Sequence, residues 1–178
     1  LQTWSFIHQS FVDFLADKVD LQSAHRRLAK FYLDAWGGWE AGLPNLEGAS
    51  KLHDGYGLQY LAMHLNDAQW WKPLQALFAS DARLHARVPA DNYTYDGYLR
   101  DLDYAWQHAE TKADRQIINN MPPDALAECA RYALISSTIN SLAAAYIPKL
   151  VVCAVEQNLW TLSRAFSVAA KMPEPEQR

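Results

Sequence analysis

Short helical segments, each ended by glycine or proline, follow one another along almost the whole of this 178-residue chain. Leu21, Ala24 and Leu28 recur at the three- and four-residue spacing that places side chains on one helix face, and Gly37 then follows as a helix terminator. Strand signals are almost absent after the first few positions. The sequence therefore predicts an all-α fold.

Capping residues and prolines set the expected limits of these helices. Asp20 or Ser23 caps the first helix, Pro73 lies in the first turn of a later one, and Pro122 with Pro123 breaks the chain between two long ones. The predicted helices run at about 20–36, 54–65, 73–78, 80–88, 94–111, 124–144, 148–155 and 161–169.

Helices of this kind, separated by proline or polar turns, favour antiparallel pairs stacked into a superhelical array, since each pair needs a neighbour to cover its apolar face. The sequence has no strict internal period, so no named repeat type is assigned. The segment 37–52 is rich in glycine and poor in periodic apolar residues, and it is predicted to be the least ordered loop.

Composition limits the partners that the chain is expected to bind. Half of the residues are hydrophobic and 20% are charged, which indicates a packed globular protein. The net charge of −4 gives no basis for binding nucleic acid or an anionic membrane, and no apolar run approaches the ~20 residues of a membrane span. Cys129 and Cys153 predict two buried free thiols and a reducing cytoplasm.

A histidine stands near the N-terminus, where a strand-like apolar segment passes into a helix. Ile7, His8 and Gln9 precede Phe11 and Phe14, which lie at helical spacing. This segment resembles the end of the winged-helix domain in signalling ATPases of the STAND and NB-ARC class, whose MHD motif matches the triplet 7–9. The resemblance implies that His8 contacts the terminal phosphate of ADP in an intact parent protein. From the residues alone, a capping or partly buried structural role for His8 is the alternative. Gln9 departs from the acidic residue usual in the family.

The resemblance covers roughly positions 1 to 110. Segments 56–65, 70–78 and 84–88 match, in the same order, helical segments that follow the winged helix in the family. Because Leu1 is not an initiator methionine, the chain is expected to be a fragment of a longer protein. The resemblance implies the end of a winged-helix domain at 1–20, a helical domain at 21–112 and the start of a helical-repeat sensor array at 113–178.

The sequence presents no catalytic or metal-binding constellation. The phosphate loop G-x-x-x-x-G-K-[ST] does not occur, so the chain by itself is expected to bind no cofactor, whereas the parent would bind ADP or ATP. A zinc site is not predicted from the histidines. The chain is therefore not expected to be an enzyme.

Four aromatic residues are candidates for protein contacts, namely Trp70, Trp71, Trp160 and Phe166. Adjacent helical positions point about 100° apart, so one tryptophan of the pair 70–71 can be buried while the other is exposed. Core packing of both is the alternative. Phe166, with Leu162, is expected to lie on an open apolar face of the last helix.

The resemblance implies a non-catalytic helical arm of a STAND-type signalling ATPase in the cytoplasm, which couples a nucleotide switch to a sensor. The implied partners are the upstream nucleotide-binding domain and the downstream sensor repeats of the same protein, with a homo-oligomer also compatible, and with neither nucleic acid nor membrane. The alternative function is a free-standing helical-repeat module that binds other proteins.

Overall fold

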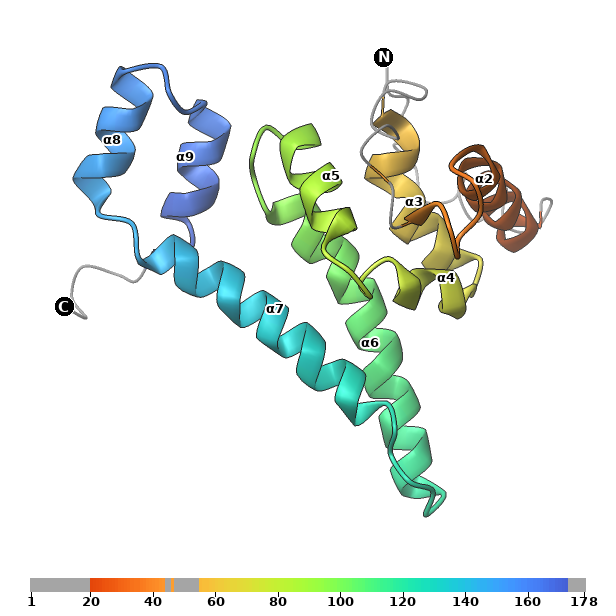
Figure 1. Ribbon diagram of the computed structural model, residues 1–178. Coiled ribbons are helices and arrows are strands. Elements are labelled where there is room, and N and C mark those ends of the chain that lie inside the picture. The colour runs from red at the N-terminus through yellow and green to blue at the C-terminus, as the bar shows by residue number, and fades with distance from the viewer. Residues whose placement is uncertain (1–19, 44–45, 47–54, 173–178) are drawn as a thin grey trace, which may run out of the picture.

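The computed structural model describes residues 20–43, 46 and 55–172, whose course Figure 1 shows. All regular structure in this part of the chain is helical, which confirms the all-α class. His8 and the expected winged-helix remnant, apart from Asp20, lie outside the described residues. The helices are α2 (Leu21–Ala35), α3 (Tyr56–Asp67), α4 (Trp71–Ala76), α5 (Ala82–Ala90), α6 (Asp96–Ile118), α7 (Leu126–Ala144), α8 (Pro148–Glu156) and α9 (Leu162–Ala169).

Several predicted helix ends are confirmed by their capping contacts. The Asp20 side chain accepts a hydrogen bond from the Ser23 amide at 3.0 Å, and Thr161 does the same for the Arg164 amide at 3.2 Å. These side chains satisfy amides that would otherwise lack a partner in the first turn of α2 and α9. Pro148 opens α8, where its missing N–H removes no helical bond.

Two predicted helix ends were wrong. The stop at Pro89 was placed too early, because α5 continues to Ala90 and a proline in the last turn removes only one helical bond. The end of α6 at about residue 111 was also wrong, since the helix reaches Ile118. Ala113 is 3% exposed, so packing helps to hold the start of these two additional turns in place. The expected domain boundary at 112–113 therefore lies inside α6.

The core lies among α2 to α6, and α7 adds Tyr132 and Ile139 to it. Leu43 and Leu46, from the loop predicted to be the least ordered, are also core residues, at 4% and 1% exposure. Most of the rest of that loop lies outside the described residues. The two leucines attach the connection between α2 and α3 to the same core that the helices share.

The contact between α2 and α3 depends on a glycine. Tyr32 of α2 packs against the first turn of α3, where a Cβ at Gly57 would lie 2.3 Å from Cδ1 of the Tyr32 ring. Gly57 thus allows the ring to approach the α3 backbone more closely than any other residue would. Tyr32 also stacks on Tyr56 with ring centres 5.9 Å apart, which adds an aromatic contact to the same interface.

The C-terminal helices form a more open region. Figure 1 shows α6 and α7 meeting near the turn between them and diverging from it, with α8 and α9 at the far end of α7. Val151 is the only buried hydrophobic residue that the structure describes in α8, and α9 has none. The expectation of two buried thiols is corrected here, because Cys153 on α8 is exposed and only Cys129 is partly buried.

No single helix among the described residues is both long and apolar enough to cross a bilayer. α7 and α8 meet the criteria of length and composition only as a pair, and that pair is bent by 77°.

Candidate functional site

The tryptophans at 70 and 71 contact different partners. The guanidinium of Arg26, from α2, lies 5.1 Å from the centre of the Trp70 ring. Trp71 stacks face to face on His108 of α6, with ring centres 4.0 Å apart and planes inclined by 7°. Both tryptophans are partly buried and pack against the core. Core packing therefore occupies part of each ring, and the remaining surface of Trp71 lines a groove.

This groove, which we name the α6 groove, has a volume of about 690 Å³. Its main wall is one face of α6 from Tyr104 to Gln116, continued by the C-cap Asn119, and the lining residues there recur at three- and four-residue spacing. Asn66, Gln69 and Trp71, from the end of α3 and the start of α4, line it as well. Carboxamides and aromatic rings thus dominate the surface of the groove.

The charged residues that line the α6 groove are cations, Lys112 and Arg115. Lys112 Nζ lies 3.4 Å from Asp124 Oδ1, whereas the exposed Arg115 guanidinium forms no ion pair with a described residue. Burial lowers the pKa of His108, and the charges of Lys112 and Arg115 lower it further. His108 is therefore neutral at pH 7, and the positive charge of the groove comes from Lys112 and Arg115.

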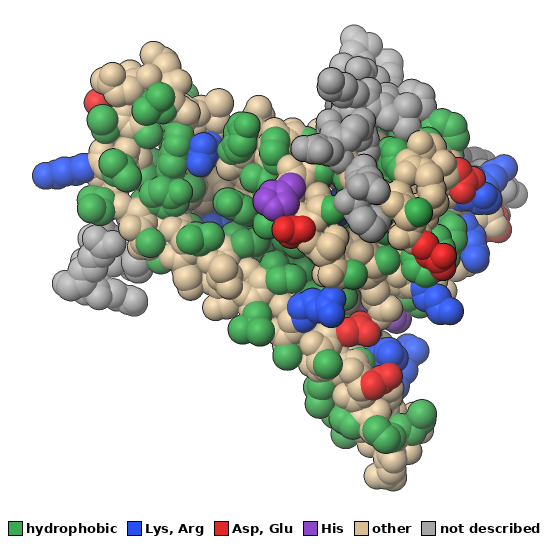
Figure 2. Space-filling view, viewed as in Figure 1, with side chains coloured by type: hydrophobic (Ala, Val, Ile, Leu, Met, Phe, Trp, Pro, Cys, Tyr) green, Lys and Arg blue, Asp and Glu red, His purple; other side chains and the backbone are tan. Residues whose placement is uncertain are grey.

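Phe166 belongs to an apolar surface formed by the C-terminal helices. It is 71% exposed, and Leu162 one turn earlier is 63% exposed. In Figure 2, hydrophobic side chains gather over this region and along α7. We use the name α7–α9 face for the exposed large hydrophobic residues of these three helices and their connections taken together, which are Leu126, Leu134, Leu142, Ile147, Leu150, Val152, Leu159, Leu162 and Phe166.

Trp160 contacts side chains near the end of α7 and in α9. Tyr146, just after α7, meets its ring edge-on with centres 5.1 Å apart. The Arg164 guanidinium lies 4.2 Å from the centre of the Trp160 ring and 5.6 Å from that of Tyr93. These contacts join the end of α7, α9 and the segment before α6. Trp160 is partly buried, so part of its ring packs inside the protein and the rest remains exposed to a partner.

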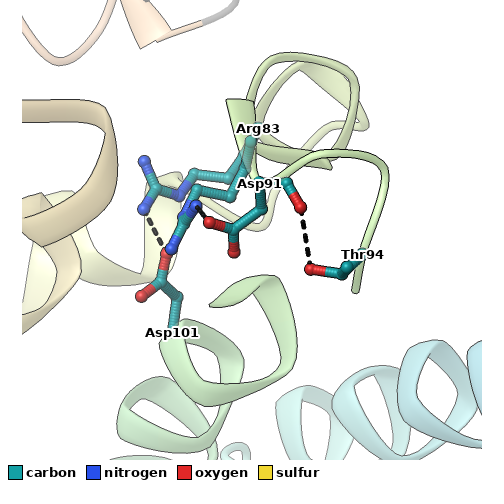
Figure 3. Close-up of polar contacts among 5 residues, drawn as sticks. Arg83, Asp91, Thr94 and Asp101 are labelled. Carbon is teal, nitrogen blue, oxygen red and sulfur yellow. Dashed lines mark hydrogen bonds and ion pairs between the residues drawn. The ribbon is translucent and has the colours of Figure 1, made fainter. Parts of the chain in front are cut away.

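A buried ion cluster, shown in Figure 3, joins α5 to α6. Arg83 and Arg87, one turn apart on α5, both reach Asp101 on α6, and these three side chains are at most 2% exposed. Arg83 Nη2 donates to Asp101 Oδ2, and Arg87 Nε lies 3.3 Å from the same oxygen. Sequence reasoning missed this cluster, because arginines at i and i+4 on a helix usually indicate a solvated face.

The partners of the cluster leave some polar atoms without hydrogen bonds. Within the described residues, Nε and Nη1 of Arg83 have no hydrogen-bond partner. Arg87 Nη1 lies 2.8 Å from Asp91 Oδ1 and forms an ion pair with it, but the two groups are not aligned for a hydrogen bond. The attraction between the two charges depends on distance more than on angle.

A glycine makes room for these charges. A Cβ at Gly97 would lie 2.0 Å from Asp91 Oδ2 and 2.2 Å from Arg87 Nη2, so a larger residue would displace the pair. Arg83, Arg87 and Asp101 are almost completely buried, whereas Asp91 at the edge of the cluster is 26% exposed. The arrangement suits a structural role, in which α5 is fixed on α6.

A second polar cluster joins α2 to α3. Nδ1 of His25 lies 2.8 Å from Nδ1 of His64, a contact that requires one ring nitrogen to carry a proton and the other to lack it. The Tyr56 hydroxyl lies 3.0 Å from His64 Nε2, and Asp67 Oδ2 lies 3.6 Å from His25 Nδ1. Burial lowers the pKa of His64 to about 4, and the neighbouring His25 acts in the same direction.

Among the described residues, no group of three or more histidine, cysteine, aspartate or glutamate side chains could hold a metal ion. The His25–His64 contact joins α2 to α3 through a hydrogen bond between ring nitrogens.

Comparisons of the chain with models of known protein families, with curated proteins and with solved structures find no match. The resemblance to STAND ATPases is therefore supported by the sequence segments named above and by none of these comparisons. His8 lies outside the described residues, so its contact with a phosphate stays a prediction.

Proposed function

We propose that this chain is a non-catalytic helical arm that acts through protein–protein contact at its α7–α9 face. The observation that carries the proposal is the exposure of nine large hydrophobic side chains between residues 126 and 166. Monomeric proteins rarely leave extended apolar surface uncovered without a partner. α9 in particular buries no residue fully, so a neighbouring surface would supply the packing that it lacks.

The proposed neighbour is a further set of helices of the same protein. In this proposal, antiparallel helix pairs stack into a superhelical array, and the next pair covers Leu162 and Phe166. Such arrays place each repeat against the one before it, so an uncovered terminal repeat presents apolar side chains. The apolar character of the α7–α9 face suits this occupant better than a charged partner.

The finer proposal is that the array belongs to a STAND-type signalling ATPase. The chain would then connect an upstream nucleotide-binding domain to downstream sensor repeats and transmit a change of state between them. The support is the triplet Ile7, His8 and Gln9 together with the order of the helical segments that follow it. A free-standing protein-binding module would present the same face without the nucleotide switch.

Self-association of the isolated chain tests the α7–α9 face, because a second copy can cover it in the absence of the natural neighbour. Sedimentation velocity over a range of concentrations should show association of the wild-type chain. Phe166→Glu should abolish it without unfolding α9, since the side chain is 71% exposed.

Ser163→Glu is the matched control, because it places the same charge at an exposed position of α9 that is not apolar. This variant should still associate. A wild-type chain that stays monomeric at the highest concentration, or equal loss in both variants, would contradict an apolar contact through Phe166.

The STAND assignment is tested separately in the longer protein. The reading frame upstream of Leu1 should encode a phosphate loop, and its absence would favour the free-standing module. In the intact protein, His8→Ala should speed the release of ADP, because one contact with the terminal phosphate is lost. An unchanged ADP off-rate would contradict the phosphate role of His8 and leave the α7–α9 face untouched.

A further inference from the structure

We propose that a small pocket between α9, the end of α7 and the start of α6 binds the carboxylate group of a short organic acid through Arg164. The pocket has a volume of about 70 Å³ and lies where α9 faces the connection between α5 and α6 (Figure 1). Neither Leu162 nor Phe166 lines it, so the inference stands apart from the contact proposed for the α7–α9 face. It rests on an unpaired cation, on an apolar wall and on the size of the pocket.

Arg164 is the cation that lacks a partner of opposite charge. Its guanidinium lies 4.2 Å from the centre of the Trp160 ring and 5.6 Å from that of Tyr93. A guanidinium that lies over a ring keeps its N–H donors in its own plane, where they can meet a carboxylate. Among the described residues, no ion pair or hydrogen bond involves this guanidinium. The rings therefore hold Arg164 in place and leave its donors unused.

Lys171, the other cation that lines the pocket, is already neutralised. Its Nζ donates to Asp96 Oδ1 on α6 and lies 3.2 Å from both the carbonyl and the hydroxyl oxygen of Ser167. No aspartate or glutamate lines the pocket, and Asp96 is the carboxylate that pairs with Lys171. The charge of Arg164 thus remains uncompensated, and an anion in the pocket would supply the missing partner.

The volume of the pocket sets the size of the ligand. A dry cavity of about 150 Å³ holds benzene, which has six carbons, so about 70 Å³ holds roughly three or four non-hydrogen atoms. This is the size of a carboxylate group with one attached carbon. Leu142, Ala143 and Val168 also line the pocket and offer the carbons an apolar wall. Tyr93 and Leu142 are 57% and 53% exposed, so the pocket opens to solvent beside them.

The backbone next to Arg164 is unusual for the residues that form it. Asn92 and Tyr93 have positive φ angles of 54° and 61°, a region that is unfavourable for a bulky aromatic residue. The Tyr93 amide donates to the Val88 carbonyl at 2.9 Å, which holds this turn in place. The turn brings the Tyr93 ring to Arg164, and backbone strain of this kind is concentrated at sites that hold ligands.

A carboxylate fits these features better than other small ions. A phosphate has five non-hydrogen atoms and carries more negative charge than one arginine offsets. An ammonium group would be repelled by Arg164. The same carboxylate chemistry comes from two sources, a free organic acid or an acidic side chain of a partner protein, and the experiment below separates them.

A nuclear magnetic resonance titration of the full 178-residue chain, at constant ionic strength, tests the proposal. The probes are propionate, its uncharged amide propionamide and the cation propylammonium. Propionate should shift the Nε–H signal of Arg164 and the amide signal of Val168, with a dissociation constant on the order of 1 mM, because so small a ligand makes few contacts. The other two probes should bind at least tenfold more weakly.

Two variants and a control identify the site. Arg164→Gln should weaken the binding of propionate at least tenfold. Lys149→Gln, at an exposed position of α8 outside the pocket, removes the same charge and should leave binding within twofold. Ala143→Leu adds three carbons, about as many atoms as the pocket holds, so it should stay folded and block propionate while Arg164 is intact. Circular dichroism checks the fold of each variant.

Acetyl-glutamate methylamide, which carries the same carboxylate on a peptide unit, separates the two sources. Binding at least tenfold tighter than that of propionate would identify an acidic side chain of a partner as the ligand, and equal or weaker binding would identify a free acid. The proposal would be overturned by equal binding of propionate and propionamide, by no binding of either carboxylate, by equal loss in the Arg164 and Lys149 variants, or by tighter binding of inorganic phosphate.

Discussion

The helices α2 to α6 and the helices α7 to α9 use similar residues in opposite surroundings. Leu58, Leu61 and Leu65 on α3 are fully buried, whereas Leu134 on α7 is 69% exposed and Leu150 on α8 is 57% exposed. α3 has neighbours on several sides, while α8 contacts mainly α9. The difference shows that an apolar helix becomes a core helix only where the fold provides a second and third surface to cover it.

The two regions also hold their polar side chains differently. The first buries two arginines and an aspartate at the interface of α5 and α6. In the second, Arg164 is only partly buried, and its guanidinium lies over the rings of Tyr93 and Trp160. Buried charges tolerate no loss of a partner, whereas a surface contact between a cation and a ring contributes little on its own. We therefore expect substitutions to be far more costly in the first region than in the second.

The largest effect is expected from Asp101→Asn. The change removes the charge that Arg83 and Arg87 share and leaves two buried guanidinium groups under-compensated, so the free energy of unfolding should fall by about 4 kcal/mol. Chemical denaturation measures the loss. Asp103→Asn, at an exposed position two residues later, is the control and should change stability by less than about 0.5 kcal/mol. Equal effects of the two variants would show that the cluster is not important for stability.

A smaller effect is expected when the same side chain is shortened in each region. Leu61→Ala creates a cavity in the core and should lower the free energy of unfolding by about 3 kcal/mol. Leu134→Ala removes a side chain that is 69% exposed and should cost less than about 0.5 kcal/mol. If Leu134→Ala were as costly as Leu61→Ala, the α7–α9 face would be covered in the isolated chain, and the contrast between the regions would fail.

Acid should weaken the first region selectively, because the chain has no histidine after His108. The pKa of His64 is about 4 in the folded protein and about 6.5 when unfolded, so between these values the unfolded chain binds more protons. The stability from neutral His64 is complete above pH 6.5 and is lost as the pH falls towards 4, by about 2 kcal/mol at pH 5. The lowered pKa of His108 acts in the same direction.

Denaturation curves between pH 7 and pH 5 measure this slope for the wild type and two variants. His64→Gln should flatten the slope, because the group that gains a proton on unfolding is gone. His85→Gln, at an exposed position of α5, should keep the wild-type slope. A wild-type stability that does not change over this range would contradict a neutral, buried His64.

Part of the candidate sites could be recognised from local patterns, and part could not. The exposure of Leu162 and Phe166 was predicted from the stacking of helices, because each unit of a helical array needs a neighbour to cover its apolar face. The α6 groove was missed because α6 was expected to end at about residue 111, which left Lys112 and Arg115 outside the helix. With the observed end, the polar positions from 104 to 119 fall on one helix face, so a longer predicted helix would have revealed the stripe.

The sequence by itself determined the class of fold and most helix starts. Caps such as Asp20 and Thr161 and the proline at 148 act within one turn, so their effect depends on neighbours in the chain. The tertiary structure decided which polar side chains are buried and which apolar ones are exposed. The pairing of Arg83 with Asp101 and of His25 with His64 joins residues far apart in sequence. Burial is a property of the assembled helices, and no local pattern specifies which faces will meet.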